Sequence, residues 1–172
     1  MWHYLKKNGN IYIDFYREEY SGTIMRMERE LFNARAAAGI IPLSLREYTL
    51  FFCLFSGDAL AGYANVLLIQ PSANIDRIGI RPDYRRMGLG EMLLYFLLGY
   101  LLNNKEIELV QLEVNSINKP AVCLYKKAGF AVSGLRKNYY ADGQDAVLMD
   151  VNIKEHIESI DVEYKKWIKE RA

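Results

Sequence analysis

The chain has 172 residues, of which 51% are hydrophobic and 25% charged, so it can bury one substantial core but is too short for a second large domain. Its 22 Lys and Arg residues against 21 Asp and Glu residues leave a formal net charge of +1. This balance gives no global attraction to nucleic acid or to an anionic membrane, and we expect neither as a partner. No apolar run has the length of a signal sequence or a membrane span, so we expect a cytoplasmic protein.

The predicted elements of the N-terminal part are a strand, Ile11–Phe15, and a helix, Thr23–Ala38, which Gly39 ends before Pro42. The helix would place four apolar residues on one face, namely Met27, Leu31, Ala34 and Ala38. Charged residues in this region could recognise a substrate, but such a run is more typical of a solvated helix face. The residues concerned are Arg17, Glu18, Glu19, Arg26, Glu28, Arg29 and Glu30.

Three strands are predicted next. Tyr48–Phe55 and Leu60–Ile69 form a β-hairpin through the turn Ser56-Gly57-Asp58, and Ile75–Ile80 follows after Pro71. Cys53 of this hairpin and the distant Cys123 fit no metal-binding or redox spacing. We therefore expect two buried free thiols, and no metal site.

A glycine loop, Arg85-Arg86-Met87-Gly88-Leu89-Gly90, separates the third of these strands from a long apolar helix that begins near Leu89. A helix start leaves backbone N–H groups unpaired at the positive end of the macrodipole, and glycines let a ligand approach closely. The loop could therefore bind a pyrophosphate. It lacks the third glycine of a dinucleotide fingerprint and the Gly-Lys-Ser/Thr of a P-loop. A plain turn into a core helix, with solvated arginines, is the alternative interpretation. The helix places a broad apolar stripe at Leu89, Met92, Leu93, Phe96, Leu97, Tyr100 and Leu101.

Downstream, the strand Ile107–Val114 alternates, so that Glu113 faces away from an apolar row. A short helix follows, with Asn118 as its N-cap and Gly129 at its end. Its apolar stripe consists of Ala121, Leu124, Tyr125 and Ala128.

The last predicted strands, Phe130–Val132 and Ala146–Val151, flank a turn at Tyr139–Gly143. An amphipathic helix over Lys154–Glu170 ends the chain. We expect one domain over residues 1–152, with residues 153–172 forming a helix that packs on that domain or on a partner.

Several of these segments together resemble the GNAT superfamily of acyl-CoA-dependent N-acyltransferases. They are Ile80-x-Pro82-x-Tyr84-Arg85-Arg86-x-Gly88-x-Gly90, Leu112-Glu113-Val114, Asn118 and Leu124-Tyr125-x-x-x-Gly129-Phe130. Within the superfamily, Leu112-Glu113-Val114-Asn115-Ser116-x-Asn118 and Arg136-Lys137-Asn138-Tyr139-Tyr140, with Asp145-Ala146-x-Leu148-Met149, resemble the RimI type, which acetylates protein N-terminal α-amines. The resemblance covers roughly Ile75 to Val151.

The resemblance implies an α/β fold with a mixed sheet splayed near its fourth and fifth strands and acetyl-CoA in the opening. The loop from Arg85 through Arg86, Met87, Gly88, Leu89 and Gly90 to Glu91 would bind the coenzyme A phosphates, by backbone N–H groups and by the two arginines. The backbones of Ile78 and Ile80 would pair with the pantetheine arm, Asn118 would bond its amides, and Tyr125 would lie at its thiol end. Plain core alternation also explains Ile78 and Ile80.

Acyl transfer from a thioester to an amine needs a neutral amine and a stabilised leaving thiolate. By the RimI-like pattern, Glu113 is the base, directly or through water, and Tyr125 is the acid. The alternatives are a solvated strand-edge carboxylate and a core tyrosine. His3 and His156 lie outside the motif region, so neither a histidine base nor a Cys123 nucleophile is expected. Tyr139 and Tyr140 would bind the substrate or, alternatively, cover the core as strand-end aromatics.

The leading prediction is acetyl transfer from acetyl-CoA to the N-terminal α-amine of a protein such as a ribosomal protein. Acetylation of a small amine, such as a polyamine or an amino sugar, is the alternative within the same fold. A non-catalytic acyl-CoA-binding module is the alternative from another class. We expect a monomer or a homodimer.

Overall fold

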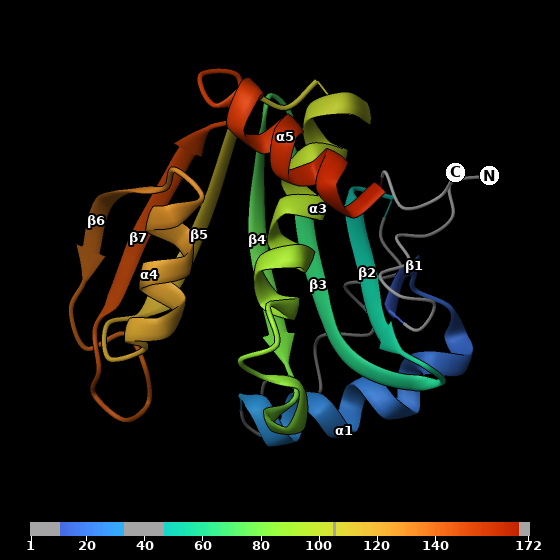
Figure 1. Ribbon diagram of the computed structural model, residues 1–172. Coiled ribbons are helices and arrows are strands. Elements are labelled where there is room, and N and C mark those ends of the chain that lie inside the picture. Colours follow the sequence, from blue (N-terminus) through green and yellow to red (C-terminus); the bar gives the residue numbers. More distant parts are fainter. Residues whose placement is uncertain (1–10, 33–46, 105, 169–172) are drawn as a thin grey trace.

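The computed structural model describes residues 11–32, 47–104 and 106–168. Within these residues, seven strands form one sheet in the order β1-β2-β3-β4-β5-β7-β6, with helices on both faces (Figure 1). The elements are β1 (Ile11–Phe15), η1 (Glu18–Tyr20), α1 (Ser21–Leu31), β2 (Thr49–Ser56), β3 (Ala59–Ile69), β4 (Ser72–Ile80), η2 (Pro82–Tyr84), α3 (Leu89–Asn104), β5 (Leu109–Asn115), α4 (Lys119–Lys127), β6 (Ala131–Arg136), β7 (Ala146–Asn152) and α5 (Ile157–Ile168).

The sheet is mixed, because β4 and β5 pair parallel whereas all other neighbours pair antiparallel. The parallel pairing is short: it runs from Ser72–Leu109 to Ile75–Leu112 and then stops. Beyond that point β4 stays paired to β3, and β5 stays paired to β7, so the sheet divides into two wings. Figure 1 shows β4 and β5 meeting at one end and diverging toward the end near α1. The expected splay between the fourth and fifth strands is confirmed.

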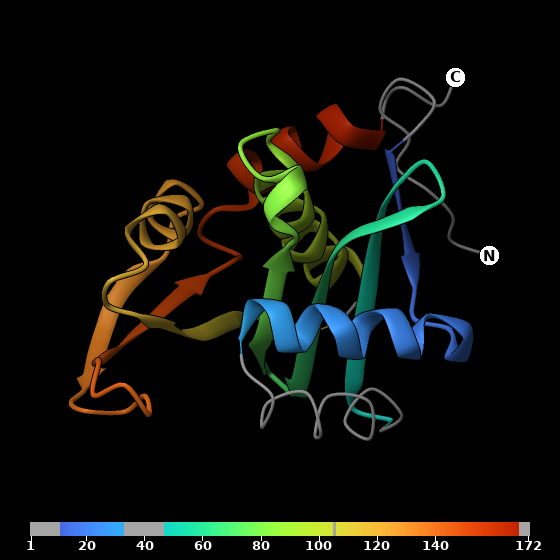
Figure 2. The ribbon, with the colours of Figure 1, turned by 90° about the horizontal axis from the view of Figure 1, so that it is seen from below.

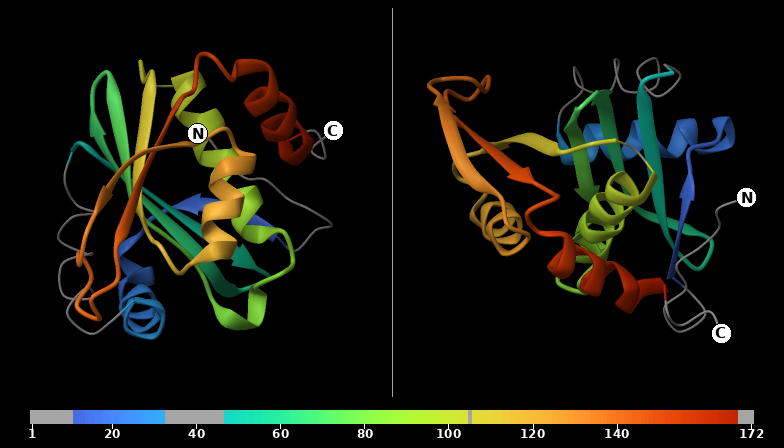
Figure 3. Two further views of the ribbon diagram at one scale, coloured as in Figure 1. Left: turned by 90° about the vertical axis from the view of Figure 1, so that its left-hand side faces the viewer. Right: turned by 90° about the horizontal axis from the view of Figure 1, so that it is seen from above.

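Helices α3, α4 and α5 cover one face of the sheet and α1 covers the other (Figures 2 and 3). The predicted stripe of α3 is at the centre of the larger core, where Met92, Leu93 and Leu97 are fully buried against strand residues such as Phe52 and Val110. A second cluster lies under α1, which packs its apolar face on β2 and β3. Its buried residues are Ile24, Met27, Phe51, Cys53, Phe55, Leu60 and Tyr63.

Helix α5 packs across α3. Ile160 is fully buried. The ring of Tyr164 lies so close to Gly99 that a Cβ added to Gly99 would be 2.4 Å from Tyr164 Cγ. Phe96 and Tyr164 also make a ring contact, at 5.9 Å between centroids. The small residue at position 99 therefore lets the two helices approach closely. No helix in the described part of the chain has the length and apolar character needed to cross a membrane.

Several predicted boundaries were wrong. The first helix was predicted over Thr23–Ala38, but α1 begins at Ser21, directly after η1, and ends at Leu31 because Phe32 leaves helical geometry. The predicted stripe at Ala34 and Ala38, the stop at Gly39 and Pro42 lie outside the described residues, as does His3. The last helix was predicted to start at about Lys154, but it starts at Ile157. Residues 153–156 form a turn, in which Lys154 N donates a hydrogen bond to Asn152 Oδ1.

The strand predicted over Phe130–Val132 runs instead over Ala131–Arg136. It is an edge strand, mostly exposed on both faces and with an irregular register at Val132/Gly134, so it carries no hydrophobic alternation to reveal its extent. Smaller shifts affect β4, which begins at Ser72, and β5, which spans Leu109–Asn115.

The burial predicted for Cys123 was also wrong. Cys53 is buried and Cys123 is exposed, and both are free thiols. Cys123 lies two residues beyond Ala121 on α4, which places it about 200° around the helix from the stripe that faces the core.

Candidate active site

The opening of the sheet begins at Glu113. Ile75–Leu112 is the last β4–β5 pair, so Glu113 is the first residue of β5 without a partner on β4. Its neighbours Leu112 and Val114 point into the core, and the alternation of a strand turns Glu113 to the other face. The predicted orientation of Glu113 is confirmed, and its carboxylate stands at the vertex between the two wings.

Two side chains from the β6–β7 hairpin hold the Glu113 carboxylate. Arg136 Nη2 lies 3.1 Å from Oε1, and the hydroxyl of Tyr139 donates a hydrogen bond to the carboxylate, which raises the pKa of Tyr139. The Arg136 guanidinium also lies over the Tyr139 ring, with its carbon 5.4 Å from the ring centroid. Glu113 is thus partly exposed and charge-paired, and it is oriented toward the hairpin loop.

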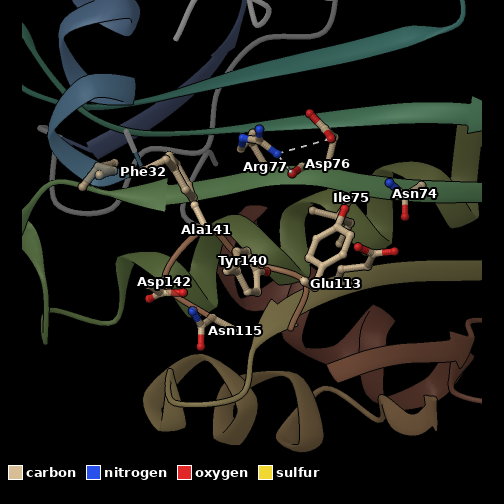
Figure 4. A pocket seen from close by; sticks show the side chains of 12 residues that line it. Phe32, Asn74, Ile75, Asp76, Arg77, Glu113, Asn115, Tyr140, Ala141 and Asp142 are labelled. Atoms are coloured by element: carbon tan, nitrogen blue, oxygen red, sulfur yellow. Dashed lines mark hydrogen bonds and ion pairs between the residues drawn. The ribbon is translucent and has the colours of Figure 1, made fainter. Parts of the chain in front are cut away.

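A cavity of about 640 Å³ lies in front of Glu113. Figure 4 shows its walls: β4 residues on one side, and Tyr140, Ala141 and Asp142 of the β6–β7 loop on the other. The lining residues are Leu31, Phe32, Asn74, Ile75, Asp76, Arg77, Glu113, Asn115, Tyr139, Tyr140, Ala141 and Asp142. Because Leu31 and Phe32 end α1, the cavity lies on the α1 side of the sheet. The structure therefore brings together Glu113, Tyr139 and Tyr140, the three predicted acceptor-binding residues.

Tyr125 does not line this cavity. It lies on α4 with 6% of its surface exposed, and its ring packs against Phe130 at 5.8 Å between centroids. Burial, and then the nearby Tyr140 hydroxyl, raise the pKa of Tyr125 above its usual range, so the phenol keeps its proton at neutral pH. The coupling to Tyr140 links α4 electrostatically with the cavity side of the sheet.

The glycine loop has the backbone geometry of a helix start. Arg86 and Gly88 adopt positive φ angles of 60° and 77°, and the first N–H bond of α3 runs from Met92 N to Gly88 O at 3.0 Å. The N–H groups of Leu89, Gly90 and Glu91 precede that bond, as expected at a helix N-terminus. A Cβ added to Gly88 would meet nothing within 4 Å. The loop is thus open to a ligand above these N–H groups.

The free edge of β4 provides a second set of backbone groups. Arg81 N bonds Ala61 O of β3, so alternation directs the N–H and C=O groups of Ile80 and Ile78 away from β3 and into the opening. The Nε of Arg85 donates to Ile80 O at 3.0 Å. On the other wing, Asn118 caps α4, and its Oδ1 accepts from Ala121 N at 3.3 Å.

Sequence analysis missed five polar residues of the cavity: Asn74, Asp76, Arg77, Asn115 and Asp142. It also placed Glu28 on a solvated face, whereas Glu28 is fully buried on the inner face of α1. The alternation of side chains along β4 places Arg77 and Gly79 on the same face of the sheet. Only the tertiary structure shows that this face packs against the end of α1. Among residues 11–32, 47–104 and 106–168, no group of three His, Cys, Asp or Glu side chains is placed to hold a metal ion.

A splayed mixed sheet, an open helix N-terminus on one side and a carboxylate-lined cavity on the other define a two-substrate group-transfer enzyme. The family model described as "Acetyltransferase (GNAT) family" matches residues 8–130, more than half of the chain. The chain therefore belongs to the GNAT acetyltransferase family, and the prediction of an N-acetyltransferase is confirmed.

Individual relatives agree with the family. The chain is 39% identical over 109 residues to a candidate ribosomal protein bS18-alanine N-acetyltransferase of Bacillus subtilis (strain 168), covering 63% of this chain and 72% of that protein. The Escherichia coli (strain K12) ribosomal protein bS18-alanine N-acetyltransferase is 34% identical over 110 residues, with coverages of 62% and 74%. The crystal structure of the ribosomal-protein-S18-alanine N-acetyltransferase from Escherichia coli superposes with a TM-score of 0.77 at 27% identity, covering 83% of this chain and 94% of that one.

Proposed function

We propose that the enzyme acetylates the N-terminal α-amine of a protein, with ribosomal proteins as the substrate class and acetyl-CoA as the donor. The observation that carries the proposal is the cavity in front of Glu113, which opens on the α1 side of the sheet, whereas the glycine loop opens at the start of α3 on the other side. Its volume of about 640 Å³ is within the range of small-ligand pockets and suits the end of an extended peptide. The names of the similar proteins support the same acceptor.

The donor side of the site fits coenzyme A. The N–H groups of residues 86–91 would hold its pyrophosphate at the helix start, and the Arg86 guanidinium would add positive charge. The opening-facing backbone groups of Ile78 and Ile80 would pair with the pantetheine arm as an added strand does. The side-chain amide of Asn118 would reach the same arm from the other wing. When bound, acetyl-CoA supplies the reactive thioester.

Glu113 and Tyr125 would divide the proton transfers. Glu113, held at the vertex, would take a proton from the incoming ammonium, directly or through a water. Tyr125, kept protonated by burial, would donate to the departing thiolate. Tyr139 and Tyr140 would line the path of the peptide end, with Tyr139 fixing the Glu113 carboxylate.

One observation favours a second candidate. Three carboxylates line the cavity, those of Asp76, Glu113 and Asp142, and such a lining attracts polycations. A polyamine or an amino sugar is therefore the alternative acceptor.

A panel of acceptors distinguishes the two. Purified enzyme and acetyl-CoA are incubated with a peptide that begins with a free alanine, an N-terminally blocked lysine peptide, spermidine and an amino sugar, and mass spectrometry locates the acetyl group. We expect acetylation of the free α-amine. Acetylation confined to spermidine or the amino sugar would favour the second candidate. Tight acetyl-CoA binding without turnover of any amine would indicate a binding module.

A further inference from the structure

Among the described residues that line the acceptor cavity, Arg77 is the one with a positive charge, and several contacts hold its guanidinium. Its Nη1 donates to the carbonyl oxygen of Asp76 at 2.7 Å and to Asp76 Oδ1 at 3.3 Å (Figure 4). Its guanidinium carbon lies 5.3 Å from the centroid of the Phe32 ring, at the end of α1. These contacts involve Nη1 and the planar face, and Nε is buried, so Nη2 is the guanidinium nitrogen that remains to donate into the cavity.

Behind Arg77 lies a carboxylate that the proposed reaction does not use. Glu28 has no exposed surface, and its Oε2 lies 3.8 Å from Arg77 Nε. Among the described residues, neither Glu28 oxygen nor Arg77 Nε has a hydrogen-bond partner. A buried ion pair of this kind costs desolvation energy that its attraction hardly offsets, so stability alone does not account for it. The attraction does favour the orientation in which Arg77 Nε faces Glu28.

The charge of Arg77 acts across the cavity. Arg77, Tyr139 and Tyr140 line the same cavity, and the Arg77 charge lowers the pKa values of both tyrosines against the larger effects that raise them. With Asp76, Glu113 and Asp142 also lining the cavity, the lining carries more negative than positive charge. An acidic side chain would be repelled there, whereas a neutral carbonyl oxygen can accept from Nη2 without that repulsion.

We propose that Arg77 is a specificity-determining residue that donates a hydrogen bond to a main-chain carbonyl oxygen of the acceptor peptide, and that Glu28 is the positioning residue that aims it. The inference rests on the proposed function, because it presumes a peptide acceptor. It gives the enzyme a means to prefer a peptide over an amine that has no carbonyl near its nitrogen.

The test removes first the carbonyl group from the acceptor peptide and then the guanidinium of Arg77 from the enzyme, with activity measured at pH 8. The acceptors are an alanine-starting peptide and two analogues, in which the first or the second peptide bond is replaced by an alkene. For the wild type, one analogue should lose about 10- to 100-fold in kcat/KM, the range for one hydrogen bond to a charged group. Arg77→Gln should lose a similar factor on the peptide and little more on that analogue, because the two changes remove the same interaction.

Glu28→Gln should raise the KM for the peptide with little change in kcat, since it weakens a contact made equally before and during the reaction. The double variant Glu28→Gln/Arg77→Gln should have the same KM for the peptide as Arg77→Gln alone. The controls are Glu30→Gln and Arg29→Gln, two exposed changes on the same helix, which should leave the peptide KM unchanged.

Each variant is also checked for acetyl-CoA affinity by calorimetry, and wild-type affinity shows that the fold is intact. If Arg77→Gln keeps its activity on the peptide, or loses the same factor on the peptide and on both analogues, the inference is wrong while the proposed function stands. A wild type that acetylates spermidine but no peptide would overturn both. If Glu28→Gln lowers kcat and acetyl-CoA affinity together, Glu28 has only a structural role.

Discussion

The two proposed proton carriers differ in burial, and the difference suits their roles. Tyr125 is almost fully buried, which raises its pKa and keeps the phenol protonated. Glu113 is partly exposed at the vertex of the opening, where it pairs with Arg136 and can exchange protons with solvent. An acid that holds its proton and a base in contact with water are what a thioester-to-amine transfer requires.

Tyr125→Phe should lower kcat by ~100-fold, at the low end for general acid–base catalysis. The ring contact with Phe130 survives the change, so folding and acetyl-CoA affinity should stay close to wild type. Steady-state kinetics and calorimetry measure both quantities. Tyr95→Phe is the matched control, because it removes a buried hydroxyl that donates to Lys127 O at the C-terminal end of α4. Equal kcat values for Tyr125→Phe and Tyr95→Phe would show that Tyr125 contributes only to packing.

Glu113→Gln should reduce activity most at low pH. A peptide α-amine has a pKa near 8, so it supplies more of its own neutral form as the pH rises and depends less on a base. The ratio of wild-type to variant kcat/KM should therefore shrink between about pH 6 and pH 9, with acetyl-CoA affinity unchanged. Parallel pH profiles would show that Glu113 does not deprotonate the acceptor.

Glu28 should make the protein less stable as the pH rises. Burial, opposed by Arg77 and assisted by Asp76, raises the pKa of Glu28 to about 7 from 4.5. Between these values the native state binds a proton that the unfolded chain has released, so the free energy of unfolding falls with rising pH, by about 3 kcal/mol in all. The loss is complete about one pH unit above 7, where Glu28 is ionised in both states.

Glu28→Gln removes this dependence. Relative to wild type, its free energy of unfolding should increase by up to roughly 3 kcal/mol between pH 4 and pH 8, as measured by urea denaturation. Glu30→Gln, exposed on the same helix, should show no such trend. A wild-type minus Glu28→Gln difference that stays constant over this range would contradict the account. Arg77 was not predictable as a site residue from the sequence, because only the tertiary structure places its face of β4 against the end of α1. Glu28, in contrast, shares helical spacing with Ile24 and Leu31, a pattern that could have placed it on the buried face.

At the scale of elements, strong periodicity predicted structure well and weak periodicity did not. Helix α3 and strand β5 were predicted because both carry regular apolar patterns with buried residues at the expected spacing. The edge strand β6 has no such pattern, and the end of α1 is set by Phe32 and not by an evident stop signal. The glycine loop was predicted to lead into the long helix. The structure agrees, because Gly88 has a positive φ and lies before the first helical hydrogen bond.

The position of this loop at the N-terminus of α3 leads to a prediction about acetyl-CoA binding. Gly88→Asp should abolish acetyl-CoA binding, because it places a negative charge at the N–H groups that would hold the pyrophosphate. Folding should persist, since the added Cβ meets no atom within 4 Å and Asp tolerates the left-handed region at a cost of about 1 kcal/mol. The control is Gly88→Asn, which has the same shape without the charge and should keep most of the affinity. Equal affinity of Gly88→Asp and wild type in calorimetry would contradict this binding site.

The whole molecule has one feature that organises the others: the β4–β5 pairing stops after Ile75–Leu112. The two wings then diverge (Figure 1), so that backbone groups at the free edge of β4 face the opening and a cavity lies on the α1 side. The resemblance to a family predicted this splay, but the residues alone could not, because strand pairing between distant segments leaves no local pattern. In the proposed arrangement, donor and acceptor would therefore bind on opposite sides of one opening.

The most direct test is a crystal structure of the enzyme with coenzyme A joined through an acetyl linker to the α-nitrogen of an alanine-starting peptide. The account predicts the pyrophosphate on the N–H groups of residues 86–91, the sulfur within hydrogen-bond reach of the Tyr125 hydroxyl, and the α-nitrogen near Glu113, directly or through one water. The peptide should leave through the cavity between Arg77 and Tyr140. A peptide that leaves on the α3–α4 side, or an α-nitrogen far from Glu113, would contradict it.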